Sequence, residues 1–160
     1  MYKKLSGNSV RTVLLAASLA AAPFFAFPAH GEEPGADVCS FIPDEEVALA
    51  VKGRVLDSKA YDDKCVYIVA FEDESLPRRT FVVYRHGADA YDGLRGALEG
   101  KVDNVEGLGD EAVMSYDEES MRYWLLVNNR GKVTFQVSGD DPETVRRLAE
   151  VVLPRLGAKE

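Results

Sequence analysis

The sequence has few of the side chains that most enzymes and metal proteins use for chemistry. Its 160 residues include two cysteines and two histidines. Of the two histidines, only His86 lies beyond the first 31 residues. There is no Gly-x-Ser-x-Gly elbow, phosphate-binding loop or dinucleotide fingerprint. A lone histidine at the end of a predicted strand is more typical of a solvated or capped side chain than of a base or a metal ligand. These absences predict a protein without a cofactor and favour a non-enzymatic role.

Carboxylates are the reactive groups that remain. The acidic turns at 62–63 and 117–119 offer oxygen ligands for calcium, but neither fits an EF-hand loop, and acidic turns are usually solvated. Facing pairs of carboxylates cannot be recognised in a sequence, so a carboxylate-based hydrolase stays as an alternative. Asp110 and Glu111 are its candidate acid and base.

The first 31 residues have no acidic side chain and no apolar run long enough for a typical membrane-spanning helix. Their basic residues are Lys3, Lys4 and Arg11. The apolar run at 12–27 has about sixteen residues, against the roughly twenty that a spanning helix needs. Small residues then precede a plausible cut between Gly31 and Glu32. This layout predicts a signal peptide at 1–31, no membrane anchor after its removal, and a periplasmic or secreted protein.

Removal of that segment makes the chain strongly acidic. Three of the 19 basic residues go with it, leaving 16 basic against 27 acidic side chains, a net charge of −11. Such a surface repels phosphate backbones and anionic headgroups, which argues against nucleic-acid and membrane-surface roles. Acidity is also an ordinary route to solubility. Residues 32–38 are predicted to form a short flexible lead.

The two cysteines, Cys39 and Cys65, are predicted to form a structural disulfide. Disulfides persist in exported proteins, and an even count at this separation favours a bridge. A redox-active pair is the alternative, but catalytic thiols usually lie in a Cys-x-x-Cys motif, which is absent. The bridge would attach the first helix to the sheet.

Apolar periodicity predicts a helix at 43–53, three strands, a helix at 88–99, three more strands and a final helix. Pro43 suits the first helical position, and either Asp140 or Asp141 caps the final helix ahead of Pro142. The predicted strands are 54–61, 64–71, 80–85, 111–116, 122–127 and 132–138.

A glycine-containing turn separates the two halves of this pattern. Its motif is Gly107, Leu108, Gly109, Asp110 and Glu111, and the two glycines are interpreted as backbone geometry rather than a ligand loop. The strands at 64–71 and 122–127 are apolar on both faces, which predicts helices on both sides of the sheet. The predicted fold is therefore an α/β (α+β) three-layer α/β/α sandwich, with a mostly antiparallel sheet of about six strands in the order α-βββ-α-βββ-α.

The chain resembles exported bacterial domains of unknown function with the Mog/PsbP-like α/β/α sandwich, including actinobacterial lipoproteins. The resemblance spans 39–157, as a single domain. It rests on Cys39 before a Pro-Asp-Glu-Glu-Val helix, Cys65-Val-Tyr, Val-Glu-Gly-Leu-Gly-Asp-Glu-Ala at 105–112, Gly-Lys-Val at 131–133 and a terminal Thr-Val-Arg-Arg-Leu-Ala-Glu helix. Two departures are Ile42 in place of a Ser or Thr cap, and Cys39, which is not a lipobox cysteine.

Members of this broad fold act mainly as accessory or binding subunits, so the resemblance implies a non-catalytic module of the cell envelope. The expected partner is an envelope protein or a small ligand, held in a groove between helix and sheet by a monomeric domain. Six aromatic residues are in surplus, although most are expected to fill the core or an interface. They are Tyr67, Tyr84, Tyr91, Tyr116, Tyr123 and Trp124.

Overall fold

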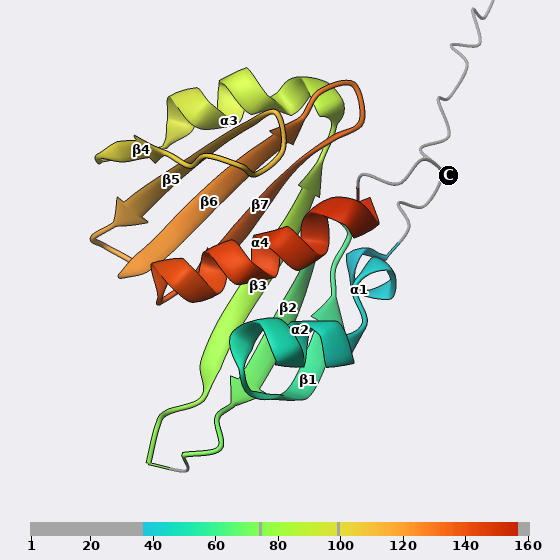
Figure 1. Ribbon diagram of the computed structural model, residues 1–160, viewed down its shortest axis with the longest axis vertical. Coiled ribbons are helices and arrows are strands. Elements are labelled where there is room, and N and C mark those ends of the chain that lie inside the picture. The colour runs from blue at the N-terminus through green and yellow to red at the C-terminus, as the bar shows by residue number, and fades with distance from the viewer. Residues whose placement is uncertain (1–36, 74, 99, 157–160) are drawn as a thin grey trace, which may run out of the picture. The chain divides into compact units, whose positions relative to one another are not determined.

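The computed structural model describes residues 37–73, 75–98 and 100–156, which build a seven-stranded sheet accompanied by short helices (Figure 1). The predicted signal peptide, the cut between Gly31 and Glu32 and all of the lead except its last two residues lie outside the described residues. Within the described part of the chain, no helix has the length and apolar character needed to cross a membrane.

Neighbouring strands all pair antiparallel, in the order β1-β2-β3-β7-β6-β5-β4. The two halves of the chain join where β3 pairs with β7. The prediction of six strands missed β4, because its three residues are all exposed and too few to show an alternating pattern. The strands are β1 (Arg54–Ala60), β2 (Lys64–Ala70), β3 (Arg79–His86), β4 (Val102–Asn104), β5 (Glu111–Asp117), β6 (Arg122–Asn129) and β7 (Val133–Gly139).

The helices are mostly short. The predicted first helix is α2, which Pro43 precedes as its N-cap residue instead of opening it, and a further short helix, α1, comes before it. The predicted helix at 88–99 is a 3-10 turn followed by seven α-helical residues. The helices are α1 (Val38–Phe41), α2 (Asp44–Val51), η1 (Ala88–Ala90), α3 (Tyr91–Ala97) and α4 (Pro142–Leu156).

The main hydrophobic core lies between one side of the sheet and helices α1, α2 and α4 (Figure 1). The sheet contributes large, fully buried side chains, including Tyr67, Phe81 and Phe135. Helix α4 buries its predicted apolar stripe against β6 and β7, because apolar residues at helical spacing share one face. The stripe consists of Val145, Leu148, Ala149, Val152 and Leu156.

The predicted three-layer sandwich is wrong, because the other side of the sheet is covered only in part. There α3 packs on β6, and Tyr91 of α3, Val113 of β5 and Leu126 of β6 form a small second core. The apolar residues Val66, Ile68 and Val82 of β2 and β3 lie on the same side and stay partly exposed. An apolar second face does not require a helix along its whole width: α3 has seven residues and covers only the part of the sheet at β5 and β6.

The predicted disulfide between Cys39 and Cys65 is present and connects α1 to β2, with 5.0 Å between the two Cα atoms. Next to it the buried Tyr67 hydroxyl donates a hydrogen bond to the Ile42 carbonyl at 3.2 Å, and burial holds the pKa of Tyr67 well above its ordinary value. A disulfide fits an exported protein, because such bonds form and persist in oxidising compartments.

The N-cap of α4 is Asp141, and its replacement by alanine is expected to cost about 1 kcal/mol of stability at neutral pH. The Asp141 carboxylate accepts from the Thr144 backbone N–H at 2.7 Å, and hydrogen bonding from Thr144 lowers the pKa of Asp141 from its ordinary 3.8. A lowered pKa means that the cap stabilises the fold at neutral pH and is lost as the pH falls through the folded-state pKa. Urea unfolding of the wild type and of Asp141→Ala, at pH 7 and well below pH 3.8, measures this difference.

The matched control is Asp140→Ala. Asp140 pairs with Arg79 at the surface, where an ion pair contributes about 0.5 kcal/mol or less. A larger loss for Asp140→Ala than for Asp141→Ala, or a difference that persists in acid, would contradict this assignment of the cap.

Candidate functional site

The partly covered side of the sheet carries partly exposed apolar side chains on β2, β3 and β6, with the buried Ser138 of β7 between β3 and β6. Strand register places Val66 of β2 beside Val82 of β3, Val82 beside Ser138 of β7, and Ser138 beside Trp124 of β6. Side chains directly opposite each other in register share one face of a sheet. We call this surface the open face. It consists of Val66, Ile68, Val82, Tyr84 and Trp124, all partly exposed.

Aromatic rings lie at the centre of the open face. The Tyr84 ring centroid is 5.9 Å from that of Trp124, and the His86 ring stacks on Tyr84 at 6.1 Å with an interplanar angle of 5°. The Lys64 ammonium lies 5.2 Å from the Tyr84 centroid, and Gln136 makes a 3.0 Å hydrogen bond with the His86 ring. His86, predicted to be a solvated or capped side chain, belongs to a hydrogen-bonded aromatic cluster.

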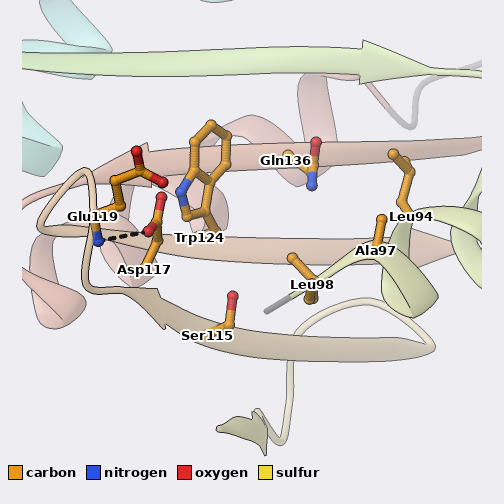
Figure 2. Close-up of a pocket in the computed structure, with 8 residues that line it drawn as sticks. All are labelled: Leu94, Ala97, Leu98, Ser115, Asp117, Glu119, Trp124 and Gln136. Atoms are coloured by element: carbon orange, nitrogen blue, oxygen red, sulfur yellow. Dashed lines mark hydrogen bonds between the residues drawn. The ribbon is translucent and has the colours of Figure 1, made fainter. Parts of the chain in front are cut away.

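The open face continues into a hollow of about 370 Å³ between α3 and the sheet (Figure 2). Helix α3 supplies one apolar wall with Leu94, Ala97 and Leu98, and Trp124 supplies apolar surface on the sheet. This volume is in the range of sites for small molecules or for a single large side chain. The remaining lining residues are Ser115, Asp117, Glu119 and Gln136.

The carboxylates of Asp117 and Glu119 lie at the end of the hollow next to the β5–β6 hairpin turn (Figure 2). The Asp117 carboxylate accepts from the Ser120 hydroxyl at 2.5 Å and from the Glu119 backbone N–H at 2.9 Å. These bonds lower the pKa of Asp117, so that it stays ionised. With Glu118 and Glu119 beside it, this end of the hollow is strongly negative.

The predicted turn motif shapes the backbone between β4 and β5. Gly107 and Gly109 have φ angles of +75° and +64°, and Leu108 between them is buried in the main core. The turn therefore lies inside the second half of the fold, after β4, and does not mark its start.

Both carboxylates of the candidate hydrolase pair, Asp110 and Glu111, contact Arg130. Asp110 accepts from the backbone N–H of Arg130 at 2.8 Å, while the Glu111 carboxylate pairs with the Arg130 guanidinium. Both carboxylates therefore already have partners in the β6–β7 hairpin.

The acidic turns considered for calcium do not assemble into a metal site. Across residues 37–73, 75–98 and 100–156, no three His, Cys, Asp or Glu side chains converge in a way that could hold a metal ion. The acids 44–46 open α2, as predicted, where negative charge is favourable.

The sequence pointed to surplus aromatics without separating the exposed from the buried ones. Tyr67 and Tyr91 are core residues, and Tyr116 and Tyr123 pair with ring centroids 4.8 Å apart. Tyr84 and Trp124, with Val66, Ile68 and Val82, form the open face. Two features of the sequence could have indicated the open face. The strand at 64–71 has apolar side chains on both of its faces, and the predicted helix is too short to cover the second of them.

In comparisons with known proteins, no family model, curated protein or solved structure matches this chain.

Proposed function

We propose that the protein is a non-catalytic binding module, exported to the periplasm or beyond the cell, whose open face docks a partner protein. The observation that carries this proposal is the partly exposed apolar and aromatic surface over β2, β3 and β6. Contiguous apolar patches of this kind mark interaction sites on exported and intracellular domains alike. The disulfide supports export.

The shape of the open face favours a protein over a small molecule. It extends across four adjacent strands, β2, β3, β7 and β6, which at about 4.8 Å per strand gives a width on the order of 15 Å. A small ligand on such an open surface would stay largely exposed, whereas small-molecule sites bury most of their ligand. A protein partner can cover the whole face and insert one apolar side chain into the hollow beside α3.

The residue types on and beside the open face are those that dominate protein interfaces. Trp, Tyr and Arg are enriched among residues that contribute most to binding. Trp124 and Tyr84 are in contact, and Arg122 is held at the edge by bonds from its guanidinium to the Thr80 and Ser138 carbonyls, at 2.8 and 3.1 Å. Fixed side chains lose little entropy on binding, which favours affinity.

Charge defines the partner further. Asp117 and Glu119 line the hollow, and Glu118 lies between them in sequence, so the partner is expected to present a basic residue beside its inserted apolar side chain. Pairing of rim charges of this kind affects chiefly the rate of association and its dependence on salt.

Photo-crosslinking tests the proposal. A benzoyl-phenylalanine residue replacing Tyr84 is expected to capture one discrete envelope protein, because Tyr84 is central to the open face. The matched control places the same residue at Leu49, which is 80% exposed on α2 across the sheet. Glu118→Gln with Glu119→Gln should reduce capture at Tyr84 several-fold at low salt.

With the captured protein purified, Trp124→Ala is expected to weaken binding at least tenfold, as truncation of a central aromatic does at protein interfaces. Thermal melting of the variant checks that it is folded. The same adducts at Tyr84 and Leu49, or an adduct only with a second copy of this chain, would contradict the proposal.

A further inference from the structure

The sheet has two edge strands of very different length. The edge strand β4 has three residues and the edge strand β1 has seven, and within the described residues each pairs with a single neighbouring strand. The outer backbone groups of an edge strand can pair with a further strand, and a very short edge offers few of them. The described sheet can therefore be extended chiefly along β1.

The backbone groups of Ser58 and Ala60 point toward this edge. At the β1–β2 hairpin the Tyr61 N–H donates to the Lys64 carbonyl at 2.8 Å. Along an antiparallel pair, the N–H and C=O groups of successive residues point alternately toward the neighbouring strand and away from it. The backbone of Tyr61 points toward β2, so Ala60 and Ser58 point away from it. The bulge of β1 does not disturb this order, because the register with β2 is regular over 57–60.

The side chains of this edge strand carry charges of both signs. β1 contains Arg54, Asp57 and Lys59, whereas acidic side chains outnumber basic ones 27 to 19 in the whole sequence. Copies of an acidic chain repel each other least where the local charge is balanced or basic. Asp57 and Lys59 are exposed, and across the described ranges neither has an ion-pair partner. Their register partners on β2 are Ile68 and Val66, so both point to the side of the open face.

We propose that β1 pairs with β1 of a second copy of this chain, antiparallel and about a two-fold axis at Ser58. Ser58 of each copy then exchanges backbone hydrogen bonds with Ser58 of the other, through the groups that point outward. Asp57 of each copy lies opposite Lys59 of the other, which gives two identical ion pairs across the axis.

The charges also select this register over its neighbours. An axis at Asp57 would place Asp57 opposite Asp57 of the second copy, and an axis at Lys59 would place two lysines opposite each other. Like charges directly opposite in a sheet are destabilising. The edge is therefore complementary to itself in the register centred on Ser58.

This dimer joins the two seven-stranded sheets into one. A two-fold axis between neighbouring antiparallel strands runs perpendicular to the sheet, so the open faces of both copies lie on the same side. The proposal replaces the monomer expected from the resemblance. It does not rest on docking at the open face, because Tyr84 lies on β3 and is separated from this edge by β2.

Sedimentation velocity of the exported protein, from micromolar to near-millimolar concentration, tests the dimer. We expect a reversible monomer–dimer equilibrium that is weak, because one strand pair is smaller than a standard interface. Lys59→Asp should weaken association about tenfold, since both ion pairs become like-charge pairs. The double variant Asp57→Lys with Lys59→Asp should restore it, because both pairs form again with their signs exchanged.

Hydrogen exchange locates the contact. The Ser58 amide should exchange more slowly as the concentration of the wild type rises, and should lose this dependence in Lys59→Asp. The control is Leu49→Asp, which changes an exposed apolar side chain on α2 and should leave association unchanged. Thermal melting checks that each variant is folded. A monomer at near-millimolar concentration, no restoration in the double variant, concentration-independent exchange at Ser58, or a dimer lost in Leu49→Asp would overturn the proposal.

Discussion

Replacing Cys39 and Cys65 together by alanine is expected to lower the free energy of unfolding by about 3.5 kcal/mol. The bridge joins residues 26 apart in sequence and so closes a loop of 27 residues. In the chain-entropy description, opening a loop of this length gives the unfolded chain that much extra freedom. Alanine suits Cys65, which is fully buried, because it introduces no polar group.

Urea denaturation of the wild type and the double variant, each with and without a reducing agent, measures the effect. Reduction should destabilise the wild type by a similar amount and leave the double variant unchanged, because both cysteines of the described chain are in the bridge. A double variant as stable as the oxidised wild type would show that the bridge does not hold α1 on the sheet.

Gly109→Ala is expected to cost about 3 kcal/mol. Gly109 has a φ of +64°, where an alanine is strained by about 1–2 kcal/mol. An added Cβ would also lie 2.6 Å from the Asn128 carbonyl oxygen and 2.9 Å from a Val127 methyl carbon. That carbonyl accepts the hydrogen bond from the Asp110 backbone N–H, so the collision also disturbs the pairing of the turn with β6. Overpacking of this kind adds about 1–3 kcal/mol.

Gly107→Ala is the matched control. Its φ of +75° is equally unsuited to alanine, but nothing lies within 4 Å of an added Cβ. Its expected cost is about 1 kcal/mol, from the backbone conformation alone. Chemical denaturation of both variants compares the two losses, and equal losses would show that the contact with β6 does not matter.

Much of the local structure of this protein follows from the order of its residues. The alternation at 132–138 and the apolar stripe of α4 identified elements that the structure contains. The disulfide followed from two cysteines in a chain with an export-like start. These features depend on neighbours in sequence or on composition, which is why a sequence shows them.

The sandwich prediction failed because no sequence pattern shows how much of each face of the sheet a helix covers. The second apolar set of β2, Val66 and Ile68, showed correctly that both faces carry apolar side chains. It did not show what covers them. Whether these side chains are covered depends on where α3 packs. This seven-residue helix packs on β6, in the other half of the sheet.

The open face was hidden for the same reason. Tyr84 and Trp124 are 40 positions apart, and only the pairing of β3 and β6 with β7 places their rings 5.9 Å apart.

The sequence by itself determined all the strands of the described residues except β4, where the main helix lies and which cysteines pair, because apolar spacing and composition act over short distances along the chain. The tertiary structure alone decided the strand order, the side on which each helix packs, and therefore which apolar and polar groups remain available to a partner. Those outcomes depend on contacts between distant segments, and the free energy of such contacts is not contained in any local pattern.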